Sequence, residues 1–155
     1  MKLLNVFFYS VIMSACLLIT QNTYADFDTT TFKSIFKNET ATQLKVIVRD
    51  DSRTKLAEKT FNPGNSYTFK WIIGCKKVKT CTFSVLDNQN NTVIGTGKFT
   101  MTGGRYSDHK DQCINEIYNF DSCSDDDSTD NFSLTCSYIT SSQDGRNRNG
   151  KITIK

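Results

Sequence analysis

The sequence predicts an all-β fold, a single antiparallel β-sandwich that is immunoglobulin-like in the broad sense. Short runs rich in Val, Ile, Thr, Phe and Tyr alternate apolar and polar residues along most of the chain, as half-buried strands do. Polar turn sequences separate these runs, and no window keeps apolar residues at helical spacing over three turns. About seven to nine short strands of this kind suit a disulfide-stapled sandwich, and a small β-barrel is the alternative.

Each expected strand is an alternating stretch bounded by turn residues. In chain order, the expected strands are residues 32–37, 43–50, 55–61, 66–75, 81–87, 92–102, 113–120 and 131–140. The turn at residues 62–65 has a physical basis, because Pro63 fixes φ and Gly64 accepts the positive φ of a type II turn. The sandwich domain is expected to span residues 26–143. Residues 144–155 are then a polar loop followed by a last edge strand or a loose tail.

Residues 1–25 carry the features of a secretory signal peptide. Lys2 precedes an uncharged, mostly apolar stretch at residues 3–20, and Ala25 stands at the expected cleavage site. A retained membrane anchor is one alternative, and lipidation of Cys16 within a lipobox-like Met-Ser-Ala-Cys sequence is another. No later apolar stretch is long enough to cross a bilayer. The mature chain is therefore expected to be secreted or periplasmic, without an integral membrane segment.

Composition limits the class of partner and suggests a source. The formal net charge of +3 falls by one when Lys2 leaves with the signal peptide, and this mild positive charge argues against a nucleic-acid partner. A single proline, many Lys, Asn, Thr and Ile residues and the short signal peptide favour a bacterial origin.

The mature chain keeps five cysteines, which in an exported protein are expected to form disulfides. Cys75 and Cys81 bracket the sequence Lys-Lys-Val-Lys-Thr, and we expect them to form a cross-strand disulfide at the tip of a hairpin. Cys113, Cys123 and Cys136 then share one disulfide, either Cys113–Cys123 or Cys123–Cys136. The remaining cysteine is free or joins two chains, so the protein is expected to be a monomer or a disulfide-linked dimer.

The register of this hairpin supports the Cys75–Cys81 prediction. If the two cysteines face each other across antiparallel strands, Ile73 faces Phe83, and the other apolar residues of both strands fall on the same face. A zinc site is not expected, because the chain has one His and lacks closely spaced ligands. A thioredoxin-like redox site needs Cys-x-x-Cys at the start of a helix, and this pair is wider and lies between strands.

Basic residues at the hairpin tip are the main candidate binding site. Lys76, Lys77 and Lys79 lie between the two cysteines, and Arg146 and Arg148 lie in the polar loop near the end of the chain. Ammonium groups on a rigid loop attract phosphate, sulfate or carboxylate, so the expected partner is an anionic lipid headgroup, a glycan or an acidic protein. The alternative is that these lysines keep the hairpin soluble and protect strand edges.

An acidic segment is a weaker candidate, for Ca²⁺. Asp125, Asp127 and Asp130 offer hard oxygen ligands, but their spacing is not that of an EF-hand loop, and a solvated acidic loop is the alternative. No other cofactor is expected. His109 and Cys113 are the only candidate base and nucleophile, and we expect Cys113 to be oxidised rather than catalytic.

These observations predict an exported, non-catalytic binding protein, such as a secreted effector or host-surface factor, that recognises an anionic partner through a basic tip. One alternative is a periplasmic enzyme inhibitor or envelope-maintenance protein, whose binding would depend little on salt. Another is a small hydrolase, because the two carboxylates of a glycosidase need not form a sequence motif.

Overall fold

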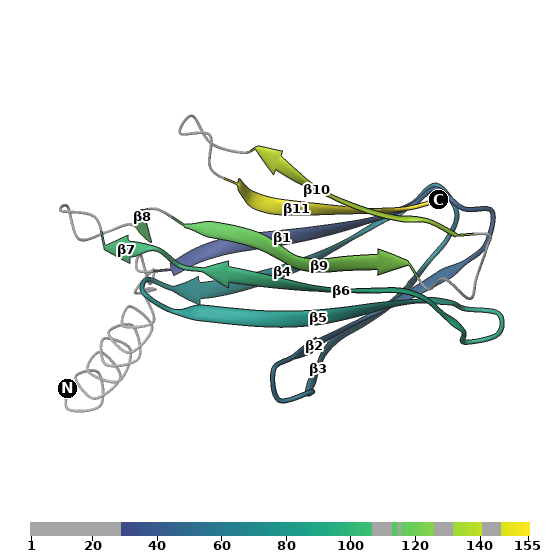
Figure 1. Cartoon of the computed structure of the whole chain (residues 1–155), viewed down its shortest axis with the longest axis horizontal. Coiled ribbons are helices and arrows are strands. Elements are labelled where there is room, and N and C mark those ends of the chain that lie inside the picture. Colours follow the sequence, from purple (N-terminus) through teal and green to yellow (C-terminus); the bar gives the residue numbers. More distant parts are fainter. Residues whose placement is uncertain (1–28, 107–112, 115, 126–131, 141–146) are drawn as a thin grey trace, which may run out of the picture.

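Two β-sheets packed face to face make up most of the computed structural model, which describes residues 29–106, 113–114, 116–125, 132–140 and 147–155 (Figure 1). The four-stranded sheet has the order β10 (Leu134–Thr140), β11 (Asn147–Ile154), β1 (Thr29–Asn38) and β4 (Ser66–Gly74). The five-stranded sheet has the order β3 (Lys55–Phe61), β2 (Leu44–Asp50), β5 (Val78–Asp87), β6 (Val93–Thr102) and β9 (Ile117–Asp125). The predicted sandwich is therefore confirmed, and the two sheets do not close into a barrel.

A short pair of strands lies at one end of the sandwich, where β7 (Arg105–Tyr106) pairs with β8 (Cys113–Ile114). The predicted signal peptide and its cleavage site at Ala25 lie outside the described residues. Within those residues, no helix has the length and apolar character needed to span a membrane.

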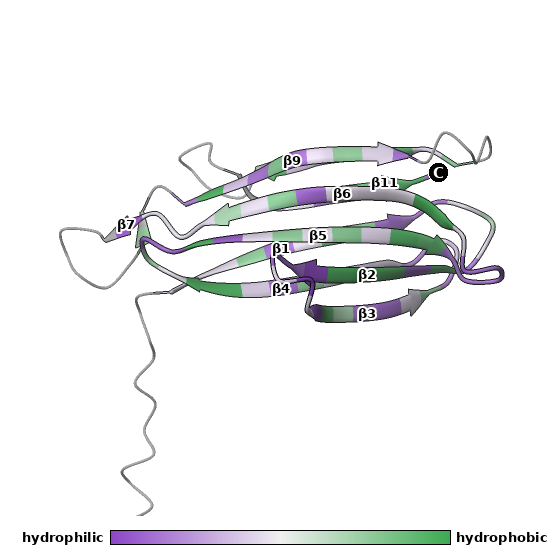
Figure 2. Ribbon diagram, turned by 60° about the horizontal axis from the view of Figure 1, so that its bottom comes forward, coloured by the Kyte–Doolittle hydropathy of each residue, from purple (hydrophilic) through white to green (hydrophobic). Residues whose placement is uncertain are grey.

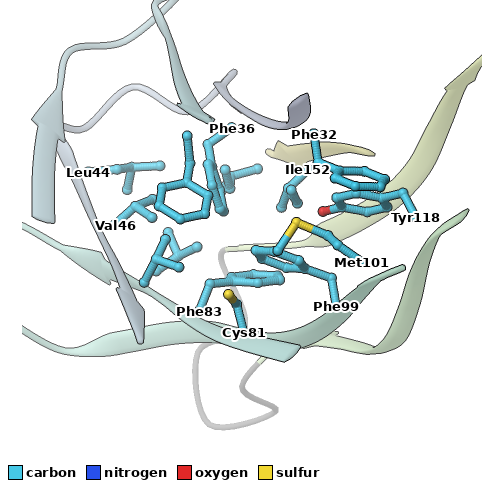
Figure 3. Close-up of a cluster of buried hydrophobic side chains, with 14 of the residues drawn as sticks. Phe32, Phe36, Leu44, Val46, Cys81, Phe83, Phe99, Met101, Tyr118 and Ile152 are labelled. Atoms are coloured by element: carbon cyan, nitrogen blue, oxygen red, sulfur yellow. The ribbon is translucent and has the colours of Figure 1, made fainter. Parts of the chain in front are cut away.

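Alternation along the strands builds the core. In β1, Phe32, Ser34 and Phe36 are buried while the residues between them are more exposed, and Figure 2 shows hydrophobic and hydrophilic residues alternating along several strands. The inward side chains of both sheets meet in one aromatic-rich core (Figure 3). Two ring pairs illustrate this, each with centroids 5.3 Å apart: Phe36 with Phe83, and Phe99 with Tyr118.

The prediction of a hairpin between β4 and β5 is wrong. β4 pairs with β1 in one sheet, whereas β5 pairs with β2 and β6 in the other. The predicted faces are nevertheless right, because Phe69 and Ile73 of β4 are buried, as are Phe83 and Val85 of β5. Apolar residues from two facing sheets enter the same core, so alternation alone cannot distinguish a neighbouring strand from one in the opposite sheet.

The end of the chain forms an inner strand, which corrects the prediction of an edge strand or loose tail. β11 lies between β10 and β1, antiparallel to the first and parallel to the second. Ile152 and Ile154 are buried in the core. A Cβ at Gly150 would lie 2.5 Å from the Tyr118 ring, so a glycine lets this strand approach the ring closely. The polar residues 147–149 resemble part of a loop in the sequence, although they belong to the strand.

The disulfide pairing also differs from the main prediction. Cys75 is bonded to Cys113, with Cα atoms 5.3 Å apart, and Cys81 is a free, buried cysteine. The predicted disulfide between Cys75 and Cys81 does not form, because Cys75 follows β4 of one sheet and Cys81 lies in β5 of the other. Cys123 is bonded to Cys136, with Cα atoms 6.2 Å apart, which confirms one of the two predicted alternatives and joins β9 of one sheet to β10 of the other.

Candidate functional site

The outer side of the four-stranded sheet carries a group of lysines, which we call the lysine face. Its members alternate with the buried residues of β1, β4 and β11 and therefore point away from the core. They are Lys33, Lys37, Lys70 and Lys151. Lys33 and Lys70 are exposed, and Lys37 and Lys151 are half-buried.

Two of these lysines occupy directly opposite positions in neighbouring strands. The antiparallel register of β1 and β4 pairs Lys33 with Lys70, which places their Cβ atoms about 4.5–5.5 Å apart. On its other side, Lys33 pairs with Asn149 of β11, and Ile35 pairs with Lys151. Like charges directly opposite one another destabilise a sheet. The Lys33–Lys70 pair therefore lowers the stability of the fold unless an anion lies between the two ammonium groups.

No carboxylate offsets this charge within the sheet. The four strands hold five basic residues, Lys33, Lys37, Lys70, Arg148 and Lys151, and neither Asp nor Glu. The five-stranded sheet is mixed instead, with basic Lys45, Arg49, Lys55, Lys59, Lys79 and Lys98 and acidic Asp50, Glu58, Asp87, Asp121 and Asp125. The charged residues in the strands of the four-stranded sheet are therefore all basic, although the net charge of the chain is small.

The surroundings of the lysine face combine hydroxyl groups with the apolar side chain of Ile35 and contain few competing partners. Lys37 donates a hydrogen bond to the carbonyl oxygen of Gly64. No carboxylate of the described part of the chain forms an ion pair with Lys33, Lys70 or Lys151. Thr31, Thr68 and Ser137 lie on the same outer side, so hydroxyl donors accompany the ammonium groups. This set of groups suits the oxygens of phosphate, sulfate or carboxylate.

The basic turn predicted as the tip of a stapled hairpin instead connects the two sheets, and other contacts hold it. Lys76 and Lys77 are exposed in the turn between β4 and β5. The backbone N–H of Lys76 donates to the carbonyl of Gly104 (2.6 Å), and the N–H of Gly103 donates to the carbonyl of Lys77 (2.8 Å). A Cβ at Gly103 would lie 2.1 Å from the Gly74 carbonyl oxygen. The turn is thus packed against the chain that leaves β6, and the Cys75–Cys113 disulfide adds a covalent tie.

The third predicted tip residue, Lys79, already has partners. Its Nζ lies 3.5 Å from an oxygen of Asp50 and 5.9 Å from the ring centre of Trp71. The pKa of the Asp50 carboxyl is lowered, chiefly by a hydrogen bond from the Ser52 hydroxyl and further by the Thr54 N–H and Lys79. Lys79 is therefore partly neutralised and does not extend the tip.

The remaining predicted residues add no assembled site within the described part of the chain. Arg148 lies in β11, and Asp125 is exposed at the end of β9. Arg146, Asp127, Asp130 and His109 lie outside the described residues. No cluster of three or more His, Cys, Asp or Glu side chains suited to a metal ion occurs among the residues that are described.

The described cysteines offer no reactive thiol at neutral pH. Cys113 is bonded to Cys75, so the expectation that it is oxidised is confirmed. Cys81 is fully buried, and burial raises the pKa of its thiol to about 12. A thiol with this pKa stays protonated and weakly nucleophilic at physiological pH.

Comparison with known proteins assigns no function to this surface. No protein-family model matches the chain, and no curated protein is significantly similar to it. Sequence reasoning missed the lysine face because Lys33, Lys70 and Lys151 are far apart in the chain and meet only through the strand order. One signal was present in the sequence, because the stretches that form these four strands contain no acidic residue.

Proposed function

We propose that this protein is an exported, non-catalytic binding protein that recognises a polyanionic partner through the lysine face. The observation that carries the proposal is the Lys33–Lys70 pair, directly opposed within a sheet whose strands hold no acidic residue. An anion that contacts both ammonium groups replaces their repulsion with two charge-assisted hydrogen bonds. The two disulfides and the sequence of residues 1–25 support export, because such bonds persist in oxidising compartments.

The test compares charge reversal on the two sheets. Lys33→Glu/Lys70→Glu changes the lysine face, and the matched control Lys59→Glu/Lys98→Glu makes the same change at exposed positions of the five-stranded sheet. Both variants alter the net charge equally, so a difference between them reports position rather than total charge. Binding to immobilised heparin, a sulfated polyanion, is measured by elution at increasing salt.

We expect the purified protein to bind heparin and the lysine-face variant to lose at least about tenfold in affinity, because two attractive contacts become repulsive. The control should lose much less. Affinity should also fall as salt rises, because screening weakens contacts between exposed charges. Equal losses in the two variants would show that net charge, and not the lysine face, governs binding.

A further inference from the structure

Exposed apolar side chains gather at the end of the sandwich that carries Lys76 and Lys77. Four large hydrophobic side chains are markedly exposed among the described residues, and three of them lie here: Ile72 (65% exposed), Val78 (61%) and Ile117 (55%). Ile72 stands near the end of β4, Val78 begins β5 and Ile117 begins β9. Figure 2 colours the end of β4 nearest this turn as hydrophobic. We call the three residues the apolar rim.

The apolar rim projects on both sides of the same end. Ile72 points outward from the four-stranded sheet, because its neighbour Ile73 is buried. Val78 and Ile117 point outward from the five-stranded sheet, and both lie beside Thr102 of β6 in the strand register. A rigid, flat partner would cover only one of these sides. A fluid interface that surrounds the end of the molecule would cover all three side chains at once.

Basic groups lie close to the apolar rim, both in the turn beyond it and further back along the four-stranded sheet. Lys76 and Lys77 are exposed in the turn between Ile72 and Val78. On the four-stranded sheet, the Thr31–Ile72 pair is followed by the Lys33–Lys70 pair, two residues and about 7 Å further along the strands. Peripheral proteins that bind anionic membranes combine apolar side chains, inserted about 5–10 Å, with lysines that meet the headgroups.

We propose that this end of the sandwich docks on an anionic lipid bilayer, with the apolar rim inserted into the interface and the adjacent lysines on lipid phosphates. The inference rests on the proposed function, because it names the polyanion as a membrane surface. Burial of three aliphatic side chains distinguishes this surface from a soluble polyanion, which offers charge but no apolar layer.

The test measures co-sedimentation of the purified protein with vesicles of phosphatidylcholine, with and without phosphatidylglycerol. Ile72→Ser/Val78→Ser/Ile117→Ser removes the apolar rim, and Ile72→Leu/Val78→Leu/Ile117→Leu is the matched control that keeps it apolar. We expect binding to the anionic vesicles only, a loss of at least about tenfold in the Ser variant, and retention in the Leu variant. Heparin binding should be unchanged in both, since neither variant alters a charge.

A gain-of-function variant guards against misfolding as an explanation for lost binding. Val78→Trp enlarges the apolar rim at an exposed position and should strengthen binding to the anionic vesicles. Three outcomes would overturn the membrane inference: unchanged vesicle binding in the Ser variant, no gain in Val78→Trp, or heparin binding by the unaltered protein without vesicle binding. Each of them leaves the lysine face intact as a site for a polyanionic partner. Absence of both heparin and vesicle binding would overturn the proposed function as well.

Discussion

At the residue scale, Cys81 is a free cysteine whose side chain is buried in the core. Its position alternates in phase with Phe83 and Val85, and its side chain indeed points into the core (Figure 3). Cys75 lies in the turn after β4 and is bonded to Cys113, a contact between distant segments that alternation along the strands does not reveal. The consequence is a cysteine that contributes packing as a small apolar side chain, with no role in a staple.

Burial of the Cys81 thiol should make stability fall at alkaline pH. The thiol has a pKa of about 12 in the folded protein and an ordinary value of 9.0 when exposed. Between these values the unfolded chain loses the proton and the folded chain retains it, so the free energy of unfolding falls as pH rises. We expect it to drop by about 1 kcal/mol more in the unaltered protein than in Cys81→Ala between pH 8 and pH 10, measured by urea unfolding.

Thiol labelling provides an independent check of the same residue. The native protein should resist a thiol reagent, whereas the protein in denaturant should react at Cys81. Rapid labelling under native conditions, or equal pH dependence of the two proteins, would contradict the buried position.

At the element scale, the sequence predicts strands better than it predicts their neighbours. The stretch at residues 55–61 is observed with the same bounds as β3, and the stretch at residues 92–102 differs from β6 by one residue. Strand order depends on contacts between distant segments, which period-two alternation does not encode. The parallel pairing of β11 with β1 is the clearest case, because a short, partly polar segment at the end of the chain looks like an edge.

The sequence did not predict the lysine face for the same reason. Its residues become neighbours only when β4, β1 and β11 lie side by side. The basic tip needed no such information, because Lys76 and Lys77 are adjacent in the chain and follow a strand. Local sequence therefore predicts candidate sites built from one turn, and it misses those built across a sheet.

The inner position of β11 predicts unequal costs for the same substitution in two adjacent strands. Ile152 of β11 is fully buried in the core, whereas Ile139 of the edge strand β10 is half-buried. We expect Ile152→Ala to lower the free energy of unfolding by about 2–5 kcal/mol, and Ile139→Ala by clearly less. Thermal or urea unfolding measures both. Similar costs in the two variants would mean that β11 does not insert between β10 and β1.

At the scale of the whole molecule, the two disulfides hold the two sheets together and brace the end proposed to bind a membrane. Cys123–Cys136 ties together one edge of each sheet, and Cys75–Cys113 holds the end that bears Lys76 and Lys77. The basic and apolar groups proposed to meet a membrane are thus presented on a covalently braced scaffold. Bracing reduces the conformational entropy that would be lost when the end becomes ordered on a partner.

Export, covalent structure and oligomeric state can be tested in one measurement. If residues 1–25 are a signal peptide, the exported protein should begin at Asp26, and its mass under non-reducing conditions should correspond to a single chain with two disulfides. Peptide mapping should find Cys75 linked to Cys113, Cys123 linked to Cys136, and Cys81 as a free thiol. Because the Cys81 side chain is buried, it should not link two folded chains.

Two other results would change the interpretation of the whole molecule. A lipid attached to Cys16 would show that the chain is anchored, and the membrane would then be reached without help from the apolar rim. A mass corresponding to a dimer that reduction dissociates would show that Cys81 becomes exposed. Recovery of the two-disulfide single chain, together with vesicle binding that is lost in the Ser variant, would establish a soluble exported protein that finds an anionic membrane through its folded surface alone.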